Sequence, residues 1–351
     1  MGFEEHTPVS NRTTRRQFLK TAGAIGSIGV ATTAGCMGSA DNGGSTNFRF
    51  NIPTGDKSIQ GKTPQWFKQE VEERSGGDVT IELFFNGELG GQVESFENMS
   101  SGAVDMFITG FSLAGTQYEP VQVFDTPYMY RDYEHILEAT DPEQSDVAKE
   151  LIGNLVEETN IRAIGSVVQG TRRLTLSGEP AHHPDDLKGR KVRAVPIDMM
   201  FEAVNGIGAN AVNIDWSEVP SALSTGSVDG QENPYNIIWN AGVYESQDYL
   251  IETNHMDSTL PIYISEHSWK KLSSDQQDIF RESMKAVQPK ALDELESSLS
   301  DLKQKIGDEV EIIESKDIDM PAFQSSVRSH IREKFPDWID TIEKIHGGDY
   351  Q

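Results

Sequence analysis

The alternation of strand-like and helix-like segments constrains the fold of this chain more than any other feature. Residues 48–52 alternate apolar and polar side chains, as strands do, and residues 79–85 also favour a strand. Residues 63–77 between them have the pattern of a helix, with Pro64 at its first position and Gly76 beyond its last turn. A strand, a helix and a second strand therefore follow one another directly.

The same order recurs further along the chain. The predicted series is helix 91–102, strand 103–110, strand 191–195, helix 198–206, strand 210–214, helix 216–226 and strand 227–234. Strands that alternate with helices favour parallel pairing, with helices on both faces of the sheet. The stretches MSSGAVD and LSTGSVD each join a predicted helix to a strand. Two similar α/β lobes would explain this match, and the shared chemistry of a helix-to-strand turn is the alternative.

The last third of the chain is largely helical from Ser265 to Lys305. Its apolar residues recur at spacings of three and four, which places them in one stripe: Leu292, Leu295, Leu299, Leu302 and Ile306. Pro289 lies inside this region and should break or kink the helix. A helix that packs along or between lobes is favoured over a coiled coil, because the stripe covers few heptads.

The charge of the chain excludes some partners. Among 351 residues, 56 are acidic and 30 are basic, which gives a net charge of -26. Such a surface repels nucleic acids and anionic membranes. It suits high salt, in which charge repulsion is screened over a few ångströms, so we expect a halophilic source. Acidic patches for a cationic ligand are the alternative, but the charge is spread along the whole chain.

The N-terminus has the features of an export signal. The stretch TTRRQFLK contains the pair Arg15 and Arg16, and a run of small apolar residues follows it as far as Cys36. That run is too short and too weakly hydrophobic to span a membrane. Residues 1–35 are therefore predicted to be a signal peptide of the twin-arginine type that ends in a lipobox.

Cys36 is the only cysteine of the chain, so no disulfide can form within one molecule. The preceding Thr-Ala-Gly resembles a lipobox, which predicts that Cys36 is lipidated and anchors the exported protein to the outer face of the cytoplasmic membrane. A free thiol that occurs by chance is the alternative. Residues 36–46 are rich in Gly and Ser and are predicted to form a flexible tether.

Signatures of enzymes are absent from the sequence. No HExxH, phosphate-binding loop or G-x-S-x-G pattern occurs. His182 and His183 are adjacent in a proline-flanked loop, which favours a solvated pair over a metal site. We therefore expect neither catalysis nor a metal or cofactor. Several arginines do lie near predicted strand ends, where a guanidinium can hold a carboxylate with two parallel hydrogen bonds.

Four cations are crowded into the stretch LKGRKVRA. On a strand, Arg193 faces opposite to Val192 and Ala194, so it points to a cleft if those two pack in the core. The alternative for Arg193 is a structural salt bridge with a nearby acid. The other three cations precede or begin the strand and are expected to be solvated: Lys188, Arg190 and Lys191.

Several segments, taken in order, resemble the substrate-binding proteins of TRAP (tripartite ATP-independent periplasmic) transporters. They are FNGELGGQVESFENMSSGAVDMFITG, QGTRRLT, DDLKGRKVRAVP and WSEVPSALSTGSVDGQENP. The resemblance implies a two-lobed α/β fold like that of periplasmic binding proteins (class II type). Mixed or parallel sheets would be flanked by helices, and one long helix would span both lobes. Lobe I is expected to comprise residues 47–169 plus 259–297, and lobe II residues 170–258 plus 298–351.

The resemblance also implies a function. The protein would be an exported solute-binding lipoprotein that captures an organic acid by hinge closure and delivers it to the membrane subunits of a TRAP-type permease. The acid could be a dicarboxylate, an oxo or hydroxy acid, or a sugar acid. A binding protein that serves a chemosensory or signalling receptor is the first alternative. A secreted lyase or hydrolase on the same fold is the second, but the sequence offers no nucleophile paired with a base.

The resemblance further implies the residues of the site. Arg193 would pair with the ligand carboxylate, and Arg172 and Asn233 would also contact the ligand. Trp216 would form a wall of the pocket, and Gln92 would contribute from the other lobe. Arg173 is adjacent to Arg172, and the sequence leaves open which of the two faces the cleft, although Arg172 matches the family position.

Overall fold

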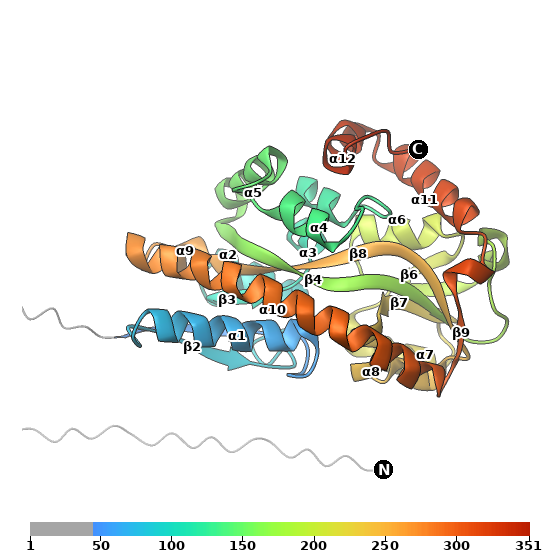
Figure 1. The fold of residues 1–351 in the computed structure, drawn as a ribbon, viewed down its shortest axis with the longest axis horizontal. Coiled ribbons are helices and arrows are strands. Elements are labelled where there is room, and N and C mark those ends of the chain that lie inside the picture. The colour runs from blue at the N-terminus through green and yellow to red at the C-terminus, as the bar shows by residue number, and fades with distance from the viewer. Residues whose placement is uncertain (1–44) are drawn as a thin grey trace, which may run out of the picture. The chain divides into compact units, whose positions relative to one another are not determined.

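The computed structural model describes residues 45–351 (Figure 1). Arg15, Arg16 and Cys36 lie outside the described residues, so the predicted signal peptide and lipidation site stay predictions.

One mixed sheet of nine strands forms the centre of the described unit, in the order β2-β1-β3-β8-β4-β7-β5-β6 with β9 paired to β8. The strands are β1 (Thr46–Asn51), β2 (Val79–Phe84), β3 (Met106–Ile108), β4 (Ile161–Leu176), β5 (Lys191–Ala194), β6 (Asn210–Asn213), β7 (Gly230–Pro234), β8 (Tyr249–Ser265) and β9 (Glu311–Ile313). The predicted parallel pairing holds within β2-β1-β3 and within β7-β5-β6. The long strands β4 and β8 run antiparallel to each other between these two groups.

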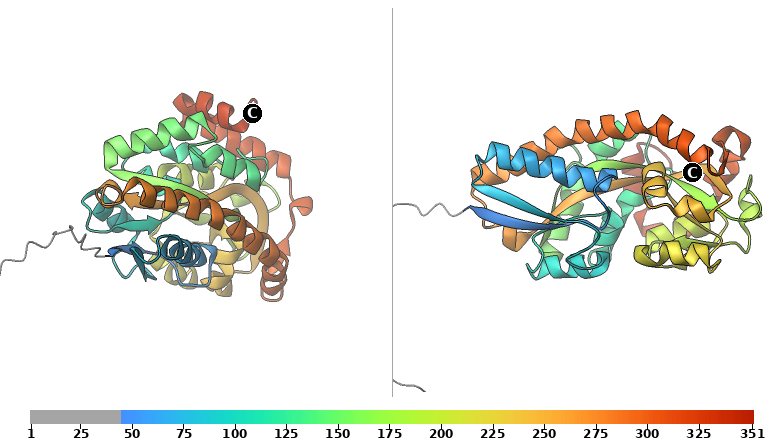
Figure 2. Two further views of the ribbon diagram at one scale, coloured as in Figure 1. Left: turned by 60° about the vertical axis from the view of Figure 1, so that its left-hand side comes forward. Right: turned by 90° about the horizontal axis from the view of Figure 1, so that it is seen from below.

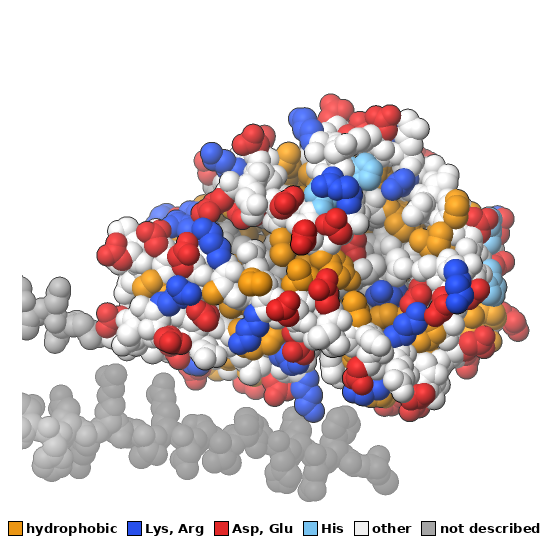
Figure 3. Space-filling view, in the orientation of Figure 1, with side chains coloured by type: hydrophobic (Ala, Val, Ile, Leu, Met, Phe, Trp, Pro, Cys, Tyr) orange, Lys and Arg blue, Asp and Glu red, His pale blue; other side chains and the backbone are white. Residues whose placement is uncertain are grey.

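Helices cover both faces of the sheet. They are α1 (Ile59–Arg74), α2 (Gln92–Ser100), α3 (Phe111–Ala114), α4 (Tyr133–Thr140), α5 (Asp146–Thr159), α6 (Asp198–Gly206), α7 (Val219–Ser224), α8 (Tyr235–Asn240), α9 (Glu266–Trp269), α10 (Ser274–Gly307), α11 (Met320–Lys334) and α12 (Ile339–His346). Short 3₁₀ helices include η1 (Glu119–Asp125) and η3 (Trp216–Glu218). Acidic side chains are spread over the face shown in Figure 3, without one dominant patch.

The long helix α10 connects the two lobes (Figure 2). Phe280 near its start is fully buried and packs edge-on against Phe48 and Phe67 of the first lobe. Leu302 and Ile306 near its end belong to a separate apolar cluster with α7 and α8 of the second lobe. The helix spans 34 residues without interruption, so Pro289 does not break it. Pro289 is exposed, and water can satisfy the carbonyl that it leaves without a partner.

The strands β4 and β8 were not predicted as long strands. Both contain polar residues and bulges that disrupt the period-two pattern, including a register shift between Val168 and Gly170. Gly170 has φ +123°, a conformation that side-chain-bearing residues rarely adopt. These irregularities lie where the two strands pass from one lobe to the other, beside the cavity described next.

Candidate ligand-binding cleft

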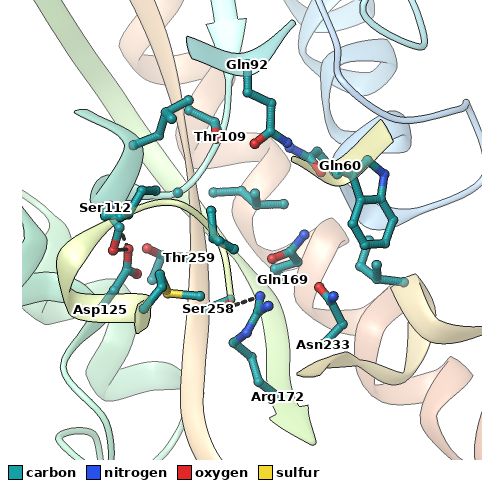
Figure 4. A pocket seen from close by; sticks show the side chains of 18 of the residues that line it. Gln60, Gln92, Thr109, Ser112, Asp125, Gln169, Arg172, Asn233, Ser258 and Thr259 are labelled. Carbon is teal, nitrogen blue, oxygen red and sulfur yellow. Dashed lines mark hydrogen bonds between the residues drawn. The ribbon is translucent and has the colours of Figure 1, made fainter. Parts of the chain in front are cut away.

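A cavity of about 90 Å³ lies between the two lobes, beside the crossing strands β4 and β8 (Figure 4). A water molecule needs roughly 10–15 Å³ of such space, so the cavity has room for several waters or a small ligand. The structure brings together all five residues that the sequence predicted for the site: Gln92, Arg172, Arg193, Trp216 and Asn233. They come from α2, β4, β5, η3 and β7.

Arg193 is almost fully buried, with 2% of its surface exposed, and its neighbours Val192 and Ala194 pack in the core. Its Nε donates a hydrogen bond to the carbonyl of Ile214 at 2.9 Å. Within residues 45–351, its guanidinium forms no ion pair with any carboxylate. Burial lowers the pKa of Arg193 to about 10, so the side chain stays cationic at neutral pH. Its terminal nitrogens are thus available to an anion.

Arg172 is buried too, but it already has an anionic partner. Its guanidinium forms a two-pronged pair with Glu232 in which Nη2 donates to Oε1 at 2.7 Å and Nε donates to Oε2. His255 lies 3.2 Å from the same carboxylate. Burial alone would raise the pKa of Glu232, but Arg172 and His255 lower it to about 2. The structural salt bridge considered for Arg193 is therefore found at Arg172 instead.

The structure places Arg172, and not Arg173, at the cavity. The register of β4 shifts between Arg172 and Leu174, which turns consecutive side chains to different surroundings. The Arg173 guanidinium lies 4.1 Å from the ring centre of Tyr235 and donates to the carbonyl of Thr171. Arg172 keeps one nitrogen directed to the cavity, Nη1, which donates to the Ser258 hydroxyl at 3.2 Å (Figure 4).

One of the three cations expected to be solvated is not. The Arg190 side chain is only 21% exposed, lies 3.6 Å from Asp229 and donates to the carbonyl of Ser177. The expectation for Arg190 is therefore wrong, because its guanidinium ties the start of β5 to the end of β4. Lys188 and Lys191 are exposed as predicted. None of the three lines the cavity, so only Arg193 of this cluster belongs to the site.

Trp216 forms part of the cavity wall. The same residue lines two neighbouring hollows of about 250 and 590 Å³, which Thr54 and Gln92 respectively share with the cavity. Its ring centre is 5.7 Å from the Arg193 guanidinium. A wall of this kind excludes water from a buried cation and strengthens its attraction for an anion.

Comparison with known proteins assigns the family. Residues 50–336 match the family described as bacterial extracellular solute-binding protein, family 7. The chain belongs to this family. It is a substrate-binding protein of TRAP transporters, as the sequence resemblance indicated.

Its relatives among TRAP and related solute-binding proteins cover most of its length. A solute-binding protein of Roseobacter denitrificans is 31% identical over 271 residues, which is 76% of this chain and 79% of that protein. The 2,3-diketo-L-gulonate-binding periplasmic protein of Escherichia coli is 27% identical over 306 residues, 85% of this chain and 91% of the relative. A crystal structure of a TRAP periplasmic solute-binding protein from Roseobacter denitrificans with bound L-galactonate has a TM-score of 0.78 at 25% identity and covers 85% of this chain and 98% of that chain. The predicted two-lobed fold is thus confirmed.

The cleft of this TRAP solute-binding protein also contains polar residues that sequence reasoning missed. They are Thr54, Gln60, Thr109, Ser112, Asp125, Gln169, Ser258 and Thr259. They belong to no recognisable motif, so no local pattern distinguishes them. Glu232 lies between Gln231 and Asn233 in the predicted strand, but nothing in the sequence indicates that its carboxylate faces Arg172.

Residues 45–351 of this TRAP solute-binding protein contain no group of three or more His, Cys, Asp or Glu side chains that could hold a metal ion. In the same range, none of the helices has the length and apolar character needed to cross a membrane.

Proposed function

We propose that this protein binds an organic acid between its lobes, closes around it and presents the closed form to a TRAP-type permease. The observation that carries the proposal is Arg193, a buried cation that has no ion-pair partner among residues 45–351 and lies in a cavity that both lobes line. An unpaired buried charge is costly, and a ligand carboxylate would compensate it. Two relatives also bind organic acids, one L-galactonate and the other 2,3-diketo-L-gulonate.

Hinge closure would be a shift between open and closed populations, driven by ligand contacts with both lobes. We propose that the lobes are residues 47–169 plus 259–297 and residues 170–258 plus 298–351. The boundary after residue 169 and the boundary after residue 258 lie side by side in the sheet, because Gly170 of β4 pairs with Ser258 of β8. The bulge beside Gly170 supports a hinge at this crossing.

A ligand screen tests the acid-binding proposal. We expect thermal stabilisation of residues 47–351 by one class of carboxylate, in molar KCl because of the proposed halophilic source. Ligand at about 100 times its Kd should stabilise the protein by about 2.7 kcal/mol. The panel contains dicarboxylates, 2-oxo acids, hydroxy acids and sugar acids, with amino acids and neutral sugars as controls. We also propose binding without catalysis, so the acid should be recovered unchanged.

The screen can contradict the proposal in two ways. Stabilisation by neutral sugars alone would mean that Arg193 serves the fold rather than a ligand. A product that accumulates from the bound acid would favour the enzyme alternative.

We further propose that Arg15 and Arg16 direct export and that lipidated Cys36 anchors the protein outside the cytoplasmic membrane. The extracellular description of the family supports export. Cys36→Ser should move the protein from the membrane fraction to the medium or periplasm. Ser39→Ala, three residues further on, is the matched control and should stay with the membrane. Retention of the Cys36→Ser variant by membranes would contradict the anchor.

A further inference from the structure

Asp125 is a buried carboxylate of the cavity with one oxygen still available. It ends η1, is 4% exposed and lines the cavity. Its Oδ2 accepts from the Ser112 backbone N–H at 2.7 Å and from the Ser112 hydroxyl. These bonds fix the orientation of the carboxylate. Oδ1 takes part in neither bond, so it has lone pairs with which to accept a hydrogen bond from a ligand.

The hydroxyl of Thr259 lies beside this carboxylate in Figure 4. It is too deeply buried for a ligand atom to reach it, and it interacts with the Asp125 carboxylate, whose pKa it helps to lower. Ser112 and Thr259 thus hold the carboxylate from the protein side, while Asp125 itself lines the cavity. A ligand hydroxyl can donate a hydrogen bond to this carboxylate, whereas a ligand carboxylate can only accept one.

The charges of the cavity lead to the same ligand class. Its charged lining residues are Arg172, Arg193 and Asp125. Glu232 neutralises Arg172, so Arg193 is the remaining cation and can pair with one ligand carboxylate. A second ligand carboxylate near Asp125 would meet a like charge and no free partner. The neutral lining residues include amides and hydroxyls that suit ligand hydroxyls: Gln60, Gln92, Thr109, Gln169, Asn233 and Ser258.

The two ends of the cavity are chemically distinct. In Figure 4, Asp125, Ser112 and Thr259 lie at one side, and Asn233 and Gln60 lie at the other. Asn233 is on β7, the strand that pairs with β5 at Arg193. A ligand that spans the cavity would therefore have its carboxylate at the Arg193 end and a hydroxyl at the Asp125 end.

We propose that Asp125, oriented by Ser112 and Thr259, forms a hydroxyl-binding subsite that makes this protein selective for hydroxylated monocarboxylic acids and against dicarboxylic acids. The inference rests on the proposed acid-binding function and names the ligand class of the same site. Burial raises the pKa of Asp125 to about 6, although Ser112, Arg172 and Thr259 lower it, so the carboxylate is charged above neutral pH. A purely structural role, in which Asp125 only holds the Ser112 N–H, is the alternative.

The test compares two ligands that differ at one carbon. L-Galactonate ends in a hydroxymethyl group, and galactarate has a carboxylate there. Calorimetry on the full-length protein above neutral pH should show galactarate binding at least about tenfold more weakly. In Asp125→Asn, an oxygen remains for the Ser112 N–H but the charge is gone. This variant should bind L-galactonate more weakly and galactarate more tightly. The ratio of the galactarate Kd to the L-galactonate Kd should therefore fall about tenfold.

The outcomes separate the subsite from the function. L-Gulonate, D-erythronate, succinate and adipate extend the panel. If the wild type binds only the unhydroxylated dicarboxylates, or binds galactarate as well as L-galactonate, the subsite is wrong and acid binding stands. If it binds no acid, both proposals fail. An unchanged ligand ratio in Asp125→Asn would support the structural alternative. If that variant does not fold, Thr259→Val decides, because it keeps the charge but removes a hydroxyl that orients Asp125, and it should still weaken L-galactonate binding.

Discussion

Replacing Arg193 by alanine is expected to weaken carboxylate binding by roughly 10- to 150-fold, because a hydrogen bond to a charged group contributes about 1.5–3 kcal/mol. Arg193 is the one cavity arginine in residues 45–351 that has no carboxylate partner, so the ligand is its natural counter-ion. Titration calorimetry with the acid identified in the screen measures the loss. Unchanged affinity in Arg193→Ala would show that the ligand carboxylate does not bind at Arg193.

The same substitution should affect the fold little. Arg193 gives one hydrogen bond, to the Ile214 carbonyl, and no buried acid is left unpaired when the side chain is removed. Arg193→Lys keeps the charge but lacks the planar fork, so it should recover only part of the affinity. Arg190→Ala is the matched control, since Arg190 lies three residues away and does not line the cavity. Its ligand affinity should equal that of the wild type, and a loss of affinity would mean that general disturbance of β5 explains both results.

Features of the fold and the site that depend on neighbouring residues could be predicted from the sequence. Features that depend on residues far apart in the sequence could not. The orientation of Arg193 was predictable because strand alternation places it opposite to Val192 and Ala194, a purely local argument. The strand–helix series of both lobes was predictable for the same reason. The long strand β8 was not, because its residues 252–255 break the register with β4 and obscure the period.

The partners of the site residues depend on the assembled sheet. Glu232 lies 60 positions from Arg172, and the two side chains meet only because β4 and β7 pair in one register. Asp125 reaches the cavity at the end of η1, and no motif surrounds it in the sequence. The family resemblance supplied the five predicted residues, but it did not supply the contacts that neutralise Arg172 and leave Arg193 free.

The second large effect is expected at Glu232. Glu232→Ala should destabilise the protein by about 3–5 kcal/mol at neutral pH, because it leaves the buried cation Arg172 without its partner. Arg172 is 4% exposed, and His255 is fully buried, so water cannot replace the carboxylate. Denaturant unfolding of the wild type and the variant measures the difference in free energy. Arg172→Met combined with Glu232→Met is the control, and it should cost less than Glu232→Ala because no charge remains unpaired.

The pH dependence of that difference follows from the pKa of Glu232, which is lowered to about 2 in the folded protein from 4.5. A group whose pKa is lower in the folded state contributes stability above its unfolded pKa and loses it as the pH falls towards the folded value. The gap in unfolding free energy between wild type and Glu232→Ala should therefore be constant above about pH 5.5 and shrink between about pH 4.5 and 2. A gap that stays constant on acidification, or Glu232→Ala as stable as the wild type at neutral pH, would mean that the pair with Arg172 does not hold the two strands together. In the expected case, the ion pair between Arg172 and Glu232 holds β4 and β7 together. Arg193 then remains the cation that can bind a ligand carboxylate.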